Sequence, residues 1–493
     1  MRRISLSLAL AVCCLLVLAA CGSSSKSSSS ASANSTDPSI AGAEVAPASA
    51  TAFVSVNTDS SAAQWKQAMK LLAGVPSLQK SLDKSLASSG ITLADAEGAL
   101  GPTTVFVELG PTAKPTDVYL TNPKDASNFK SILAKDKKEK SVTTEIESWL
   151  VVGKTQAALD QFKTAVGAGK LSDSASFKAA SAGVPADALA KAYFKGSAIN
   201  ASALSSLGST STSTTSTSSS MSKALSGAAA KHPLEWGTVA VTAATKGLSI
   251  EGVFQGKTSV TNAGSTLVDQ LPSGTSFAID LTGKSLGLDK AVQNLRNNSK
   301  YSSQIPQIEA ALGVKLDDLA ALAGSEMAIY GKGSGIGLLI KAADAAKSKQ
   351  MLDKTVTLLG AQMNGTSKPV SIAGVQATEF SFGTTKLDYG VKDGNLFLVT
   401  DAAALPGNTK LSSDPGYSAD ATELPIPASN LGVAYVDFAK LAALSKSGSA
   451  ITKSLGSSST SANLSQLEGL SSLLGYASAN GTKVEIKAFL STK

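Results

Sequence analysis

The stretch "VSIAGVQATEFSFGTTKLDYGVKDGNLFLVT", Val370–Thr400, decides the fold class. Apolar and polar residues alternate along it, as they do in strands with one buried face. Three dipeptides with turn chemistry interrupt the alternation: Ala373-Gly374, Gly383-Thr384 and Asp393-Gly394. Such short turns join antiparallel neighbours, whereas parallel strands need crossover connections of about a dozen residues or more. The stretch therefore predicts an antiparallel meander and favours an α+β fold over regular alternation of strand and helix.

Outside the meander, four blocks of sequence occur twice in the same order. "TAFVSVNT", from residue 51, matches "TSFAIDLT", from residue 275, and pairs Phe53 with Phe277 at an offset of 224 residues. "ITLADAEGALGPTTVFV", from residue 91, matches "VKLDDLAALAGSEMAIY", from residue 314. The offset grows to 242 residues between Tyr193 and Tyr435, so the second copy contains an insertion, most of which is the meander. The chain is therefore predicted to be an internal duplication.

The duplication predicts two tandem homologous α+β domains with antiparallel sheets and short amphipathic helices. We place the first repeat at residues 49–257, a linker at 258–273 and the second repeat at 274–493. In the first repeat, Trp65, Met69 and Leu72 recur at helical spacing. This spacing predicts a core-facing stripe of a helix rather than a binding site.

The N-terminus has the pattern of an export signal, which we assign to residues 1–20. A short basic start is followed by an apolar run from Ile4 to Ala20. An uncleaved membrane anchor is the alternative, since the run approaches the length that spans a bilayer. The end of the run, "LAAC", resembles the lipobox of bacterial lipoproteins. The resemblance implies cleavage before Cys21 and a diacylglyceryl group on its thiol, which places the protein on the outer, extracytoplasmic face of the cell membrane.

Residues 21–48 are predicted to be a flexible tether. They begin "CGSSSKSSSSASANSTDPS", which has too few apolar groups to offset the entropy lost on ordering. Cys13 and Cys14 lie within the signal, so Cys21 would be the only cysteine of the mature chain. We therefore expect no disulfide and no cysteine metal site within one mature chain.

Composition excludes some classes of partner. The chain has a formal charge of +7, and removal of Arg2 and Arg3 with the signal leaves +5 on a long chain. Basic residues do not cluster with aromatic ones, so we expect no nucleic-acid partner. We also expect no cofactor and no metal site.

The tripeptide Gly283-Lys284-Ser285 suggests two enzymes, and the sequence argues against both. A phosphate loop needs a glycine five residues before its Gly-Lys-Ser, and that position is Ala278. A hydrolase nucleophile elbow needs a histidine after the serine, but the chain has one histidine, His232, which lies upstream.

We expect Ser285 to cap a helix instead, as Asp59 or Ser60 would do in the first copy. The glycine-rich stretch Tyr330–Ile340 precedes a strand rather than a helix, so we predict a turn between two strands there. Two Ser/Thr-rich low-complexity stretches, residues 205–223 and 445–465, are predicted to be surface loops, with glycosylation or wall contact as the sharper alternative.

Several features together resemble a known family. They are the lipobox, the serine tether, the opening "AFVSVN" strand with "QWKQAMKLL", and the duplicated "L-x-D" helix before "TTVFVEL". The chain resembles bacterial lipoproteins that carry a domain of unknown function, number thirty-three fifty-two. The resemblance implies no activity and no catalytic residues.

These observations favour a non-enzymatic lipoprotein with a binding or scaffolding role in the cell envelope. Its membrane contact would be the diacylglyceryl group on Cys21, and its partner an envelope protein or a lipid. The alternatives are a carrier of lipid or another hydrophobic ligand, and a solute-binding lipoprotein. An envelope hydrolase comes last.

Overall fold

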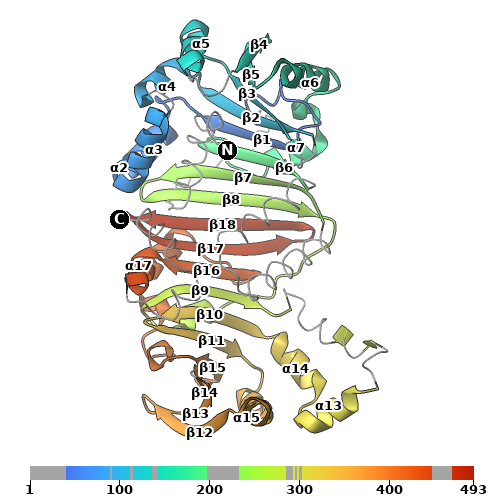
Figure 1. Ribbon diagram of the computed structural model, residues 1–493, viewed down its shortest axis with the longest axis vertical. Coiled ribbons are helices and arrows are strands. Elements are labelled where there is room, and N and C mark those ends of the chain that lie inside the picture. The colour runs from blue at the N-terminus through green and yellow to red at the C-terminus, as the bar shows by residue number, and fades with distance from the viewer. Residues whose placement is uncertain are drawn as a thin grey trace. The chain divides into compact units, whose positions relative to one another are not determined.

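The computed structural model describes residues 40–88, 92–110, 115–135, 141–196, 233–284, 293–294, 297–298, 303–383, 385–446 and 469–493. The chain divides into two compact units. The first comprises Met1–Ser259, Ser465–Ser471 and Asn480–Lys493, and the second comprises Val260–Leu464 and Ser472–Ala479. Each unit combines helices with an antiparallel sheet (Figure 1), which confirms that part of the predicted fold class.

The sheet of the first unit includes the last strand of the chain. Each strand in it is antiparallel to its neighbours. In spatial order the strands are β18 (Lys483–Thr492), β8 (Gly247–Gly256), β7 (Leu234–Ala244), β6 (Ala190–Lys195), β1 (Ala52–Asn57), β2 (Thr103–Leu109), β3 (Thr116–Thr121), β5 (Trp149–Gly153) and β4 (Val142–Ile146).

Helices and turns of the first unit bury both faces of its sheet. They are α2 (Ala63–Ala73), α3 (Pro76–Ser88), α4 (Leu93–Ala99), α5 (Ala126–Lys135), α6 (Gln156–Gly167), the 3-10 turn η1 (Leu171–Asp173) and α7 (Ala175–Ser181). Side chains alternate along β1, so Phe53 packs with α6 and α7 while Val56 packs with α2. Trp65 and Met69 lie in the α2 cluster and Leu72 packs against the next one, which confirms the predicted stripe.

Residues 40–50 are part of the folded first unit. Val45 and Ala46 are fully buried in its core. The amide of Leu171 donates to the carbonyl of Ala46 at 2.7 Å, and Pro47 forms a bridge with Lys170. The prediction that residues 40–48 belong to a flexible tether is therefore wrong, because their apolar side chains are buried in the core.

The sheet of the second unit contains the meander. In spatial order its strands are β17 (Leu470–Asn480), β16 (Gly432–Asp437), β9 (Thr275–Thr282), β10 (Glu326–Lys332), β11 (Gly335–Lys341), β15 (Asn395–Val399), β14 (Thr385–Lys392), β13 (Val375–Phe382) and β12 (Thr366–Ile372). All of these pairings are antiparallel, which confirms the predicted meander over β12–β15.

Two of the three predicted turns of the meander are confirmed by their backbone angles. Ala373 and Gly374 have φ values of 48° and 80°, and Asp393 and Gly394 have values of 52° and 76°. Positive φ at both central residues is the hairpin geometry that matches the twist of antiparallel strands. The third turn includes residue 384, which lies outside the described residues.

The second unit also contains helical elements. They are η3 (Leu267–Gln270), α13 (Ile305–Leu312), α14 (Leu316–Ala323), α15 (Ala345–Met363), η4 (Ala402–Ala404), η5 (Leu411–Ser413), α16 (Pro415–Glu423) and α17 (Phe438–Lys446). Val356 of α15 packs on Phe380 and Tyr389 of the meander. In the part of the chain that the structure describes, none of the helices is long and apolar enough to cross a bilayer.

Candidate functional site

One face of the second sheet is apolar across five neighbouring strands, β17, β16, β9, β10 and β11. Residues directly opposite one another on paired strands share a face. From β17 to β11 the three rows of this apolar face are Leu473-Val436-Phe277-Gly331-Ile336, Gly475-Ala434-Ile279-Ile329-Leu338 and Ala477-Gly432-Leu281-Met327-Ile340. Every position in these rows is apolar, so the face has no hydrogen-bonding side chain.

The centre of the apolar face is open to solvent. Ile279 and Ile329 are direct cross-strand partners, and they are 47% and 46% exposed. Beside them, a Cβ atom on Gly331 would lie 2.2 Å from the ring of Phe277, so glycine at this position allows the ring to lie across the strand. In the first unit, by contrast, Val54 and Val56 of β1 pack with α2. An exposed contiguous apolar surface of this kind is typical of an interaction site.

The opposite face of the same sheet is covered by a chain segment, residues 263–272, that we call the strap. Asn430, which is fully buried, fixes the start of the strap by four hydrogen bonds. Its side-chain oxygen accepts from the amide of Ser265 at 3.1 Å, and its side-chain nitrogen donates to the Ser265 carbonyl at 3.2 Å. Its backbone carbonyl accepts from the amides of Ala263 and Gly264.

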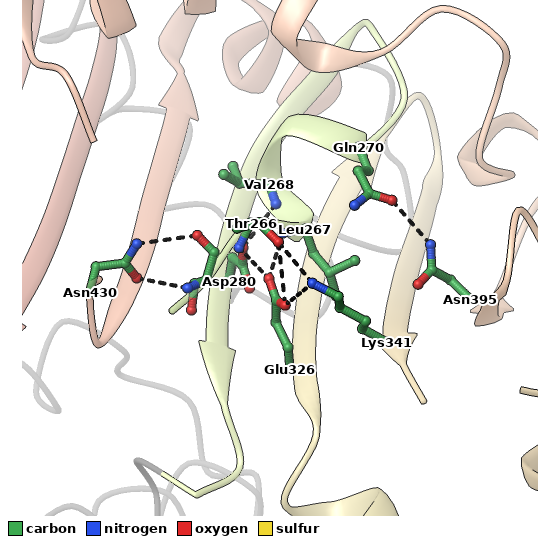
Figure 2. Close-up of polar contacts among 10 residues, drawn as sticks. Thr266, Leu267, Val268, Gln270, Asp280, Glu326, Lys341, Asn395 and Asn430 are labelled. Atoms are coloured by element: carbon green, nitrogen blue, oxygen red, sulfur yellow. Dashed lines mark hydrogen bonds and ion pairs between the residues drawn. The ribbon is translucent and has the colours of Figure 1, made fainter. Parts of the chain in front are cut away.

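Two carboxylates of the sheet hold the middle of the strap (Figure 2). Glu326 Oε1 accepts from the amides of Thr266 and Leu267, the latter at 2.6 Å. Asp280 Oδ2 accepts from the next amide, that of Val268, at 2.9 Å. Lys341 Nζ lies 3.2 Å from Glu326 Oε2 and forms an ion pair with it. The carboxylates thus satisfy three successive amides at the start of η3, which a short helix cannot satisfy internally.

Asp280 is in an unusual state for an acidic residue. Its side chain is fully buried, and among the described residues its second oxygen, Oδ1, has no hydrogen-bond partner. Burial, together with the nearby charges of Glu326 and Asp269, raises the pKa of Asp280 to about 7, although the amides of Val268 and Leu267 lower it in part. Asp280 therefore titrates near neutral pH.

The end of the strap is held by neighbouring elements. Tyr417 of α16 donates to Asp269 Oδ1 at 2.8 Å, and Asn395 of β15 donates to Gln270 Oε1 at 3.1 Å. The Leu411 amide donates to the carbonyl of Leu271 at 2.6 Å. Burial raises the pKa of Tyr417, and the negative charge of Asp269 adds to this effect. Every residue from 263 to 271 is thus bonded to the second unit.

Beneath the strap, the carboxylate of Asp280 can bind a proton. Within the described residues there is no group of three or more His, Cys, Asp or Glu side chains that could hold a metal ion. Asp280 is buried beneath backbone and faces amides, so its carboxylate has the position of a structural ligand rather than of a nucleophile. Asp280 and Glu326 were not predicted as site residues. The signal was available, because strand alternation in "TSFAIDLT" places Asp280 on the same face as Ser276 and Ala278.

The structure describes some of the residues that the sequence singled out and not others. Cys21, His232 and Ser285 lie outside the described residues. The amide of Gly283 donates to the carbonyl of Ser325 at 2.9 Å, so it is engaged by backbone. The glycine-rich stretch is the predicted turn, since β10 and β11 pair directly across it.

The predicted helix cap of the first copy is wrong. Helix α2 begins at Ala63, and its N-cap residue, Ala62, forms no side-chain capping bond. Asp59 instead accepts from the amide and hydroxyl of Ser61, at 2.9 and 2.7 Å. The short carboxylate closes a local turn before the helix, and this bond satisfies it without reaching the helix amides.

Comparison with known proteins gives a family but no activity. A family model described as "Protein of unknown function (DUF3352)" matches residues 125–488. No curated protein matches the chain. A solved chain titled "Structure of crystal form IV of TP0453" is 13% identical, over 44% of this chain and 77% of that one, with a TM-score of 0.22. A score this low does not indicate a shared fold.

Proposed function

The chain belongs to the DUF3352 family of proteins of unknown function, and from that premise we propose a non-enzymatic binding role in the cell envelope. The protein would be anchored to the outer face of the cell membrane by lipid on Cys21. Its apolar face would bind an apolar surface of an envelope partner. The exposed pair Ile279 and Ile329 is the observation that carries this proposal.

The proposed anchor is compatible with the position of the folded part. The described residues begin at Ile40, nineteen residues after Cys21. A flexible serine-rich chain of that length has a root-mean-square span of about 24 Å. Two acyl chains on Cys21 would give stable membrane attachment, which one chain does not. The first unit would then lie within a few nanometres of the bilayer surface.

We also propose that the two sheets descend from an internal duplication. The order β7-β6-β1-β2-β3-β5-β4 of the first unit corresponds strand by strand to the order β17-β16-β9-β10-β11-β15-β14 of the second, when strands are numbered along the chain and β12–β13 is set aside. In both, the opening strand lies between the second strand and the strand that contains Tyr193 or Tyr435. Hairpin β12–β13 is the extra part of the second copy.

Matched contacts support the duplication at residue level. The bridge between Pro47 and Lys170 has a counterpart between Pro272 and Lys410. The strand registers place Phe53 opposite Tyr193 and Ala278 opposite Tyr435. The structural register therefore pairs Phe53 with Ala278, one residue beyond the Phe277 that sequence similarity selected. The shift aligns Ser55 with Asp280.

Site-specific photo-crosslinking in intact cells tests the binding role. The photoreactive amino acid p-benzoylphenylalanine replaces Ile329 or, as a matched control, Ile486, an isoleucine of β18 that is 40% exposed. We expect a discrete protein adduct from position 329 and none from 486. Adducts of equal yield at both positions, or none at 329, would contradict the proposal.

A hydrophobic-ligand carrier is the second candidate, because the apolar face has no polar side chain that a lipid chain would leave unsatisfied. The same experiment separates the two. A mass increase that corresponds to a lipid at position 329, with no protein adduct, would favour the carrier. Co-purification of the adduct protein with the parent chain, and its loss in Ile279→Glu but not in Ile486→Glu, would favour the binding role.

A further inference from the structure

We propose that Asp280 is a proton-binding site that controls how firmly the strap is held on the second sheet. The proton would reside on Oδ1 while Oδ2 accepts from the Val268 amide. Loss of the proton would leave a charge that the closed strap cannot solvate, and the strap would loosen. This inference concerns the covered face of the sheet and is independent of what binds the apolar face.

The geometry of the strap points to a proton as the ligand. Asp280 is fully buried, and its Oδ1 is unpartnered in the described part of the chain. Glu326 has its own cation, Lys341, at 3.2 Å, whereas the described residues offer Asp280 no ion-pair partner. A buried unpaired carboxylate is costly, and protonation removes that cost without moving the strap.

The groups that face Asp280 favour the neutral form. Glu326 on β10 and Asp269 on η3 are acidic. Tyr417 on α16 lies near Asp280, and its hydroxyl donates a hydrogen bond to Asp269. Lys341 on β11 is a cation near the strap, and its ammonium is bonded to Glu326 and to the hydroxyl of Thr266. Deprotonation therefore adds a further negative charge to an acidic, water-poor site.

The first unit contains a natural comparison, if the duplication holds. At the aligned position, Ser55 donates its hydroxyl to the carbonyl of Ala41, 3.3 Å away, and so fastens residues 40–50 without a charge. The equivalent fastening in the second unit uses a carboxylate. The Ser55 bond has no titratable group, so residues 40–50 serve as an internal reference over the pH interval used below.

Hydrogen–deuterium exchange of the full chain in detergent tests the proposal. Exchange of peptides over residues 263–272 is measured at about pH 6 and about pH 8.5 and corrected for the intrinsic rate of amide exchange. A carboxyl that titrates near 7 in the closed state and near 4 in the open state predicts an increase of about tenfold in strap opening over this interval. Peptides over residues 40–50 should show no corresponding change.

Asp280→Asn is the decisive variant, since its amide keeps an acceptor for Val268 and cannot ionise. We expect strap protection in this variant to change by less than about threefold over the interval. Asp393→Asn, at an exposed turn position, is the matched control and should keep the tenfold change.

Glu326→Gln is the second variant if Asp280→Asn does not fold. It should move the loss of strap protection to lower pH, because removal of the neighbouring negative charge lowers the pKa of Asp280. The direction follows from that pKa: a lower pKa means that the charged form already predominates at about pH 6, so the strap should be less pH-dependent across the interval. Equal pH dependence in the parent chain and Asp280→Asn, or constant strap protection in the parent chain, would overturn the proposal.

Discussion

Asp280 is the acidic residue of β9, and its side chain faces the strap. Its neighbours on the covered face, Ser276, Ala278 and Thr282, are small or hydroxyl-bearing. Ser276 donates to the carbonyl of Gly331 at 3.0 Å and is thereby satisfied, whereas the carboxylate of Asp280 is satisfied only in part. The alternation of the strand, and hence which face Asp280 occupies, could be predicted from sequence. The three amides that meet the carboxylates could not, because they come from a segment that has no strand or helix pattern.

At the residue scale, we predict that the stability of the second unit falls as the pH rises from about 4 to about 7. The pKa of Asp280 is raised in the folded state to about 7, so the folded state binds the proton more tightly than the unfolded state does. Protonation therefore stabilises the fold, and this contribution is lost as the pH passes the folded pKa. The full difference is on the order of 4 kcal/mol.

Asp280→Asn should abolish most of this pH dependence and should be more stable than the parent chain at about pH 8. Thermal unfolding followed by circular dichroism at several pH values measures both quantities. Asp401→Asn would be a poor control because Asp401 caps η4, so the exposed Asp393→Asn is preferred. A parent chain whose stability is flat between about pH 5 and 8 would contradict the prediction.

At the scale of elements, structure that depends on adjacent residues could be predicted from sequence, and structure that depends on distant residues could not. The meander could be predicted because its turns are encoded by adjacent residues, such as Asp393-Gly394, whose positive φ angles need those residue types. The strap could not, because its fastening depends on Asn430 and Glu326, which are 165 and 59 or 60 residues away from the amides they hold. The pairing of β18 with β8 is equally non-local.

The docking of α15 on the meander offers an element-scale prediction. Phe380 is 6% exposed and packs with Val356 and Tyr389. Its ring is so close to Gly365 that a Cβ atom there would lie 2.7 Å from it. Phe380→Ala should leave a cavity beneath α15 and lower the free energy of unfolding of the second unit by about 3 kcal/mol.

Phe382→Ala is the matched control for that cavity. Phe382 stacks obliquely on Phe380 at 5.5 Å between ring centroids but is only partly buried. We expect it to cost about 1 kcal/mol, because the site can collapse or fill with water. Urea unfolding followed by circular dichroism gives both values, and equal losses in the two variants would show that α15 does not depend on Phe380.

At the scale of the whole molecule, the proposed lipid anchor on Cys21 can be tested directly. The prediction at this scale concerns the chemistry of the native N-terminus. Mass spectrometry of the protein from membranes should find an N-terminal Cys21 that carries two acyl chains, and detergent-phase partitioning should follow from them. A free amine at another residue would contradict the anchor, and retention of Met1 with the apolar run intact would support the uncleaved alternative.

The place of β18 in the first unit has a consequence for how the chain is made. A ribosome delivers Gly247–Gly256 long before Lys483–Thr492, yet these two strands pair along their length. Until β18 emerges, the β8 edge lacks its native neighbour, and an unpaired edge can recruit other chains. The first half of this protein therefore cannot finish folding ahead of the second, in contrast to domains that fold one after another during synthesis. Loss of even the final strand should damage the half of the molecule that is made first.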